Sequence, residues 1–401
     1  ARQCSYEYEY EYEYEYESGG ELAVRVGIDV EQFARDPYGS GIQRVLQQLA
    51  SNWPEHEIEA DFVFPDGDLF ALLSPDQAVG ILSVPFAEAE AGSDLRELVR
   101  TAIEAAAGPR VRGADLLSLY TCWLLPEVSY LPSVLERFRI FHASMITVMV
   151  GFDALPMTEP ANYRFPAGTV PFVSDYFRQL AQADRVICIS DYAREELWHA
   201  LRRPMNLYTE VAHPGGDHVP AQPPRDSQGP VRFIRLGTLE SRKMPLEIMN
   251  AFLAAGCDNS ELIFIGGGSS SDSSINSAIA MASESNSSVT WVKGATDAQV
   301  NELISSADVF LALGTEGYGI PVLEAIAAGT PVVFGGIQPA AELMQGAGAR
   351  EHSGFDHGNL VDLFQTYSQP GNVEELQSEI DSSRIPTWGD FANSVARACK
   401  S

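Results

Sequence analysis

Short apolar runs alternate with helical segments along nearly the whole chain, and this alternation constrains the fold more than any other feature. Leu262–Ile265, Val309–Leu313 and Pro331–Phe334 are apolar at every position rather than at every second one. Strands that are apolar on both faces lie in parallel sheets with helices on both sides. The alternation therefore predicts an α/β protein.

The apolar runs fall into two halves, which agrees with a length of 401 residues at roughly 150 residues per domain. In the first half we predict strands at Leu22–Val30, Ala60–Phe64, Asp115–Tyr120, Ile140–Phe152, Arg185–Ile189 and Leu207–Ala212, and helices at Ile42–Ala50 and Tyr192–Leu201. In the second half we predict strands at Phe233–Leu236, Leu262–Ile265, Val289–Val292, Val309–Leu313 and Pro331–Phe334, a Ser-rich loop at Ser269–Ser274, and helices at Leu246–Ala255, Asp297–Ser306 and Pro321–Ala328.

A segment rich in proline and turn residues, 218–230 (HVPAQPPRDSQGP), separates the halves and is predicted to be a linker. We therefore predict two Rossmann-like domains, 21–217 and 231–384, facing a central cleft. Ligands of such sheets bind beyond the carboxyl ends of the strands, so the cleft is the expected site.

The two ends of the chain are set apart from these domains. Residues 1–20 include a strict Tyr-Glu alternation, Tyr6–Glu17, which is low in complexity and is kept out of the fold argument. A disordered tail, a segment left by cloning and an edge strand that pairs with another chain all remain open. Residues 385–401 contain Pro386, Trp388 and a helical stretch.

The formal charge of −29 excludes a general nucleic-acid binder, because a polyanion requires a basic face. The tail contributes only −5 of this, from six Glu and one Arg, so the rest carries −24. The acidity also argues against broad docking on an anionic membrane, and leaves at most peripheral contact. Of the 26 basic residues only three are lysines, Lys243, Lys293 and Lys400.

The cysteine pattern indicates reduced thiols. The five cysteines are odd in number, widely spaced and without a CxxC pair, so neither a disulfide framework nor a zinc site is predicted. No apolar stretch reaches the ~18 residues of a membrane span, and no secretory signal is recognised at the N-terminus. We expect a cytoplasmic protein, which leaves open an association with the inner face of the membrane.

The strongest motif is 315–325, TEGYGIPVLEA, directly after a predicted strand. Turn glycines let a ligand approach the backbone, and a helix start offers free N–H groups to an anion. Glu316 in the turn is suited to accept hydrogen bonds from sugar hydroxyls, and Glu324 from a ribose diol. A solvated helix start with acidic residues explains these residues equally well on chemistry alone.

Two further Gly-containing loops follow predicted strands. The segment 237–243 (GTLESRK) would bring Arg242 and Lys243 to the predicted cleft. The guanidinium of Arg242 offers several N–H donors in one plane and the ammonium of Lys243 a compact positive charge, and both suit a diphosphate. YGSGIQR (38–44) runs into a helix and is a second place for close backbone approach. A solvated basic turn and a simple flexible turn are the respective alternatives.

Together these segments resemble the family 4 glycosyltransferases (glycosyl transferases group 1 type), which are retaining enzymes of the GT-B fold. The resemblance rests on GTLESRK, LIFIGGG (262–268), ADVFLALGTEGYGIPVLEAIAAGTPVV (307–333) and AAEL (340–343), and more weakly on GIDV with YGSGIQR, FDALP (152–156) and DRVICISDYAREEL (184–197). It implies that the C-terminal helix crosses back to the first domain.

The resemblance implies a role for each matching residue. Glu316, Arg242 and Lys243 would be catalytic, with Glu316 on the donor sugar and the two cations on the departing diphosphate. The donor-binding residues would be Gly237, Thr238, Gly317, Tyr318, Gly319, Ile320 and Glu324. The phosphate and acceptor loop would comprise Gly39, Ser40, Gly41 and Arg44, with Asp153 nearby. Thr238 stands where the family often has arginine, and Phe152 where many members have histidine.

The expected reaction is transfer of a hexose from a nucleotide diphosphate sugar to an acceptor hydroxyl of a glycan or of a lipid- or protein-linked saccharide, with retention. No cofactor and no metal is expected, and self-association remains open. Two alternatives are a non-catalytic GT-B partner subunit that binds acceptor, and a metal-dependent transferase of the other major fold that uses Asp66-Gly67-Asp68. A nicotinamide dehydrogenase is poorly supported, because Gly266-Gly267-Gly268 has no third spaced glycine.

Overall fold

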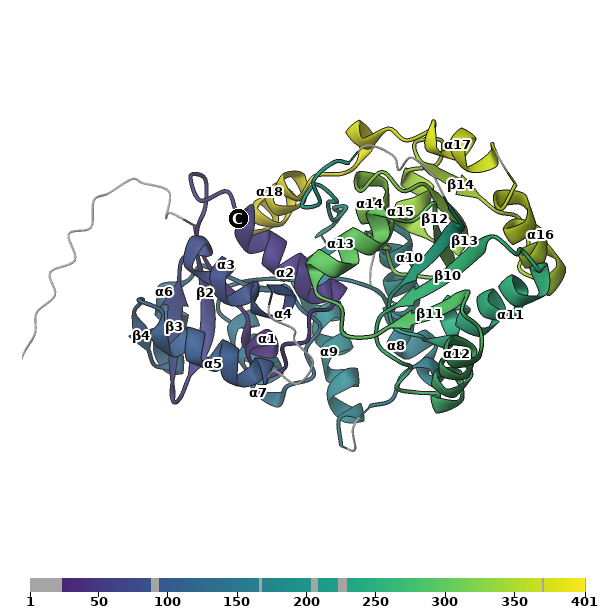
Figure 1. Cartoon of the computed structure of the whole chain (residues 1–401). Helices are drawn as coiled ribbons and strands as arrows, with labels where there is room; N and C mark the ends of the chain where they lie inside the picture. The colour runs from purple at the N-terminus through teal and green to yellow at the C-terminus, as the bar shows by residue number, and fades with distance from the viewer. Residues whose placement is uncertain are drawn as a thin grey trace, which may run out of the picture.

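The fold is known from a computed structural model that describes residues 24–87, 94–165, 168–202, 208–222, 229–369 and 371–400. Within these ranges the chain forms two sheets, each flanked by helices, and Figure 1 shows them as two lobes. The Tyr-Glu tail and the middle of the predicted linker, 223–228, lie outside the described residues. The predicted α/β architecture with two Rossmann-like parallel-sheet domains is confirmed, whereas the domain boundaries stay a prediction.

The first sheet has the described strand order β4-β3-β2-β1-β5-β6-β7-β8. Its strands are β1 (Arg25–Asp29), β2 (Glu59–Asp66), β3 (Leu69–Leu73), β4 (Arg110–Val111), β5 (Cys122–Leu125), β6 (Ile146–Gly151), β7 (Arg185–Cys188) and β8 (Tyr208–Val211). β3 pairs antiparallel with both β2 and β4, and the other pairs are parallel. The carboxyl ends of β1, β5 and β6 therefore share one edge.

Helices connect and cover these strands. They are α1 (Glu31–Arg35), α2 (Gly41–Ser51), α3 (Pro75–Leu82), α4 (Val84–Ala87), α5 (Leu95–Ala105), α6 (Leu116–Leu119), α7 (Pro132–His142), α8 (Leu155–Thr158), α9 (Val170–Gln182) and α10 (Asp191–Leu201), with short 3₁₀ turns η1 (Gly113–Asp115) and η2 (Pro160–Asn162). The amphipathic α2 begins where the Ser40 hydroxyl accepts a hydrogen bond from the Gln43 N–H, a favourable N-cap.

The second sheet is entirely parallel in the described residues, with the order β11-β10-β9-β12-β13-β14. Its strands are β9 (Val231–Leu236), β10 (Ser260–Ile265), β11 (Val289–Val292), β12 (Val309–Thr315), β13 (Val332–Ile337) and β14 (Ala349–Glu351). Its helices are α11 (Pro245–Ala255), α12 (Ser273–Ser285), α13 (Asp297–Ser305), α14 (Ile320–Ala327), α15 (Pro339–Leu343), α16 (His357–Tyr367) and α17 (Asn372–Gln377), with 3₁₀ turns η3 (Ser241–Lys243) and η4 (Ser382–Arg384). β9 and β12 are central neighbours, so the loops that follow them lie side by side.

The last helix, α18 (Trp388–Cys399), follows the second sheet in sequence but packs against α2, β5, β6 and β7 of the first (Figure 1). The Arg185 guanidinium donates to the carbonyl of Ala398 at 2.9 Å, and Arg397 pairs with Glu210 at 3.0 Å. One continuous apolar core, from Val26 in β1 through Phe391 in α18 to Phe334 in β13, joins both sheets. α18 therefore completes the first half of the molecule.

Two predicted strands are wrong. Asp115–Tyr120 forms the turn η1 and the helical turn α6, and the strand β5 begins two residues later. Leu116 and Tyr120, four residues apart, are buried while Ser118 between them is exposed, whereas a strand would place all three on one face. Ile140–Phe152 is divided between the end of α7 and β6, because Ile140, Ala143 and Ser144 are exposed and continuous burial begins only at Thr147.

No helix in the described ranges is long and apolar enough to cross a bilayer.

Candidate active site

Glu316 lies at the centre of a buried cluster of cations at the carboxyl ends of β9 and β12. Its carboxylate is 2.8 Å from the Lys243 ammonium and 2.9 Å from the Arg242 guanidinium. The Arg235 guanidinium is 3.9 Å away. The structure thus brings together the three predicted catalytic residues, although nothing in it tests their roles.

Glycines make this approach possible. Gly314, in β12, has φ +96°, and a Cβ there would lie 2.1 Å from the carbonyl oxygen of Arg242. Gly237 has φ +124°, and a Cβ there would lie 2.9 Å from the Lys243 ammonium. A side chain at Gly314 would displace η3, which carries both cations, and one at Gly237 would push the Lys243 ammonium aside.

The electrostatics of the cluster favour an additional anion. Burial alone would raise the pKa of Glu316, but Lys243, Arg242 and Arg235 outweigh it and hold that pKa well below its usual range. Burial, with the charges of Arg242 and Arg235, lowers the pKa of Lys243. Arg242 also pairs with Glu240 at 2.8 Å, so three cations face two carboxylates and one positive charge is in excess. Such an excess in a buried site is suited to a phosphate.

Arg235 was not predicted as a site residue. It lies on β9 with 5% of its surface exposed, and its Nη1 donates to the carbonyl of Leu236 at 3.1 Å. Its Nε has no hydrogen-bond partner in the described structure. The signal in the sequence is a charged residue inside a strand that is otherwise apolar, FIRL. Arg235 supplies a buried positive charge two strand positions before Gly237, close to Thr238, where the family often has arginine.

Asp153, from the first half, packs against the turn that follows Glu316. A Cβ on Gly317 would lie 2.6 Å from the Asp153 carboxylate, and the Ser190 hydroxyl donates to the Gly317 carbonyl at 2.7 Å. Burial raises the pKa of Asp153 to about 7, with the charges of Glu196 and Glu316 adding to the rise and Arg242 opposing it. The site therefore holds a carboxyl that changes charge near neutral pH.

Glu324 lies one turn into α14, whose first residue is Ile320. Gly319, at φ +104°, is the N-cap of this helix. Tyr318 is buried with its hydroxyl donating to the Pro214 carbonyl at 2.9 Å, and its ring stacks on His213 at 5.8 Å. The Glu324 carboxylate is 3.0 Å from His218 Nε2, a contact that the sequence did not predict.

The buried side chain of Gln43 is hydrogen-bonded to the backbone at the start of the Gly39–Gly41 loop. Its Oε1 accepts the N–H groups of Tyr38 at 2.9 Å and Gly39 at 3.1 Å. Arg44 pairs with Asp297 of α13 and lies over the Phe86 ring at 3.8 Å, so it joins α2 to the second half of the molecule. The structure thus places Arg44 at a contact between the two halves.

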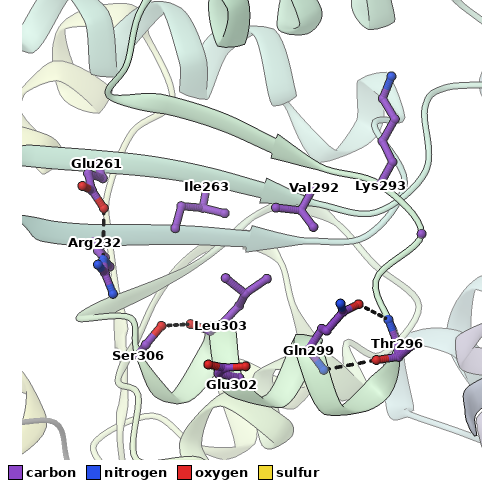
Figure 2. Close-up of a pocket in the computed structure, with 11 residues that line it drawn as sticks. Arg232, Glu261, Ile263, Val292, Lys293, Thr296, Gln299, Glu302, Leu303 and Ser306 are labelled. Atoms are coloured by element: carbon purple, nitrogen blue, oxygen red, sulfur yellow. Dashed lines mark hydrogen bonds and ion pairs between the residues drawn. The ribbon is translucent and has the colours of Figure 1, made fainter. Parts of the chain in front are cut away.

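A cavity of about 810 Å³ lies between α13 and the strands β9, β10 and β11. Figure 2 shows Ile263 and Val292 on the strand side, Leu303 on the helix side, and Lys293 pointing away. Its Arg232 and Glu261 pair with each other at 3.0 Å. None of the predicted site residues lines this cavity, and we place the active site at the cation cluster because charged groups converge there.

Asp66-Gly67-Asp68 forms the tight turn between the antiparallel strands β2 and β3, where Asp66 pairs directly with Leu69. Gly67 has φ +59°, and Asp66 forms an ion pair with Arg110 at 2.8 Å. These features are those of a hairpin turn.

Comparison with known proteins identifies the second half. Residues 222–355 match the family described as glycosyl transferases group 1. No curated protein sequence matches the chain.

Solved structures match the whole fold at low identity. HepE from Anabaena, in complex with UDP, is 14% identical and has a TM-score of 0.61, covering 93% of this chain and 97% of that one. WaaG, a glycosyltransferase involved in lipopolysaccharide biosynthesis, is 15% identical with a TM-score of 0.56, covering 93% and 95%. Sucrose-phosphate synthase from Thermosynechococcus elongatus is 14% identical with a TM-score of 0.56, covering 94% of each chain. Residues 222–355 are thus similar to the glycosyl transferases group 1 family, within a chain that has the GT-B fold.

Proposed function

We propose that the protein is a retaining glycosyltransferase that moves a hexose from a nucleotide diphosphate sugar to an acceptor hydroxyl. The observation that carries this proposal is the buried cluster of Arg235, Arg242 and Lys243 around Glu316, which has one positive charge in excess. It lies within residues 222–355, and Glu324 follows in the first turns of α14, the helix that begins directly after the Glu316 turn.

The cluster is suited to the charge that develops during transfer. As the bond between the anomeric carbon and the phosphate oxygen breaks, negative charge grows on the diphosphate. Arg242 and Lys243 stabilise that charge without reorganising, which is worth roughly 3 kcal/mol for a well-placed donor. Glu316 accepts hydrogen bonds from the sugar hydroxyls, and Glu324 holds the ribose.

The configuration of the anomeric carbon is retained when the acceptor attacks from the same face of the sugar that the leaving group departs from. The acceptor oxygen bonds to the anomeric carbon, and its proton passes to the departing phosphate oxygen, so no protein base is needed. Asp153 lies beside this position and orients the acceptor. Closure of the halves excludes water and limits hydrolysis of the donor. We further propose that no metal takes part, and that the acceptor is a free, lipid-linked or protein-linked saccharide.

The first experiment is a thermal-shift screen with UDP, GDP, ADP and dTDP, followed by transfer assays with sugar donors in the presence and absence of EDTA. Glu316→Gln should abolish transfer and leave nucleotide binding measurable. Lys243→Met should slow transfer roughly a hundredfold or more. Lys400→Met, whose ammonium pairs only with exposed Glu57 in the described structure, is the matched control and should stay active.

Full activity of Glu316→Gln would disprove its role. Binding of a nucleotide without turnover of any donor would favour the non-catalytic partner subunit. Loss of activity in EDTA, restored by a divalent cation, would show that the metal-independent mechanism is wrong. The anomeric configuration of the product, read by proton NMR, tests retention.

A further inference from the structure

His218 lies between Glu324 on α14 and Trp388, the first residue of α18. The Trp388 indole nitrogen is 3.0 Å from His218 Nδ1, and His218 Nε2 is 3.0 Å from Glu324 Oε1. The His218 and Trp388 rings meet edge to face at 5.9 Å. Both side chains of the His218–Glu324 pair are largely buried, at 11% and 13% exposure.

The indole settles which histidine nitrogen carries the proton. An indole N–H only donates, so Nδ1 of His218 must accept. In the neutral ring the proton then lies on Nε2, which donates to Glu324. We infer that Trp388 holds His218 in the Nε2–H tautomer, and that His218 in turn positions the Glu324 carboxylate to receive a nucleotide ribose. His218 is thus a positioning residue.

Trp388 is itself held in place by the segment that carries His218. Its backbone N–H donates to the Asp217 carboxylate at 2.8 Å, which satisfies a free donor at the start of α18. A Cβ on Gly215 would lie 2.3 Å from that same nitrogen, so glycine is required for the segment to pass this closely. The charged group that contacts His218 is therefore Glu324, whereas the Asp217 carboxylate is bound to the backbone of Trp388.

The arrangement leaves one side of the Glu324 carboxylate for a ligand. Oε1 accepts from His218, and Oε2 accepts no hydrogen bond from the residues that the structure describes, so it is available to the hydroxyls of a ribose. A carboxylate already held in one rotamer loses less conformational freedom when the ligand binds, which strengthens binding. The inference rests on the proposed function, because it needs a nucleotide at Glu324.

The experiment compares three His218 variants in the full chain. His218→Gln places an amide N–H near the Nε2 position and should bind UDP, or whichever of GDP and ADP gives the larger thermal shift, within about twofold of the wild type. His218→Asn keeps an acceptor for Trp388 but cannot reach Glu324, and His218→Ala removes both contacts. These two should weaken nucleoside diphosphate binding about five- to tenfold.

Inorganic pyrophosphate is the control ligand, because it carries the diphosphate charge without ribose. Its affinity should be the same in all three variants. Trp388→Phe removes the indole donor, and NMR of the labelled His218 ring should then show loss of the pure Nε2–H form. Trp123→Phe is the matched control: Trp123 is equally buried, and its indole nitrogen has no hydrogen-bond partner in the described structure.

Unchanged nucleotide affinity in His218→Ala, an equal loss of pyrophosphate affinity, or a wild-type ring protonated on Nδ1 would each overturn the inference alone. Failure of the wild type to bind any nucleoside diphosphate would overturn the proposed function, and with it this inference. His218→Gln binding as weakly as His218→Ala would show that the ring acts by packing rather than by donating to Glu324.

Discussion

The residues that matter most in the site differ in how readily the sequence reveals them. Glu316, Glu324, Arg242 and Lys243 follow predicted strands and could be identified as candidates from their positions. His218 could not, because its partners are 106 and 170 residues away and only the folded chain brings them together. Long-range contacts of this kind leave no local pattern.

Glu127 is a second residue that sequence reasoning missed. It follows β5, is 1% exposed, and accepts the Phe33 N–H at 3.0 Å. Burial raises its pKa to about 8, the charge of Asp29 adds to the rise, and hydrogen bonds from Phe33 and Gln43 oppose it. Gln43 is in turn hydrogen-bonded to the backbone of Gly39, so the Glu127 carboxyl is linked to the Gly39–Gly41 loop through one side chain.

The raised pKa of Glu127 makes stability depend on pH. The folded protein keeps the proton up to about pH 8, whereas the unfolded chain releases it above roughly pH 4.3. The folded state therefore binds more protons in this window, and its stability falls as the pH rises. Glu127→Gln should remove this contribution, so the variant should gain stability relative to wild type from about pH 4.3 to 8, by at most about 1.4 kcal/mol per pH unit.

Urea unfolding at a series of pH values tests this expectation. Glu55→Gln alters an exposed carboxyl and should follow the wild-type profile. A constant difference between Glu127→Gln and wild type across the window would mean that Glu127 is ionised in the folded protein.

At the scale of elements, the bounds of three strands were predicted closely. β10 and β12, which are buried along most of their length, were predicted within two residues, and β11, in which only Val289 is buried, at its observed bounds. α12 was not predicted, because Ser273–Ser285 is rich in serine and its apolar face is narrow, with only Ile275, Ile279 and Ala282 buried. The turn α6 was mistaken for a strand because single helical turns are too short to show a period.

Gly314 in β12 lies against the backbone of η3, so a substitution there tests how closely these two elements must pack. Gly314→Ala would place a methyl group 2.1 Å from the Arg242 carbonyl at φ +96°, so η3 must move away from β12. We expect transfer to slow at least about tenfold and stability to fall by more than about 1 kcal/mol, with the fold kept. Kinetics and circular dichroism provide the measurements.

Gly80→Ala is the control for this substitution. Gly80 lies in α3 with open space around it, so alanine should leave activity unchanged and raise stability by about 0.5–1 kcal/mol. Wild-type activity in Gly314→Ala would show that the distance between η3 and β12 does not control the reaction.

At the scale of the whole molecule, side-chain contacts between residues far apart in the chain join the two halves. Arg44 on α2 pairs with Asp297 on α13, and Asp297 is 42% exposed. Ser241 donates to Asn162 at 2.5 Å near the site. The sequence predicted the cleft from topology, but it could not predict these pairs, since each joins residues far apart in the chain.

A double-mutant cycle on Arg44→Ala and Asp297→Ala measures the first contact. For a partly exposed pair we expect a coupling of about 0.5–1 kcal/mol in the free energy of unfolding, which should shrink at high salt. If Arg44 leaves Asp297 and contacts the donor phosphate during the reaction, Arg44→Ala should lower the rate of transfer more than Asp297→Ala does. No coupling in low salt would contradict the closed arrangement of α2 and α13.

The position of α18 has a consequence for biosynthesis. The ribosome makes the first sheet long before it makes the helix that covers β5, β6 and β7. Until Trp388–Cys399 emerge, the apolar surface that Phe391, Val395 and Cys399 will cover is open to water and to other chains. The first half therefore lacks one of its packing helices while it is being synthesised. Its apolar surface can be covered by α18 only after the whole second half has been made.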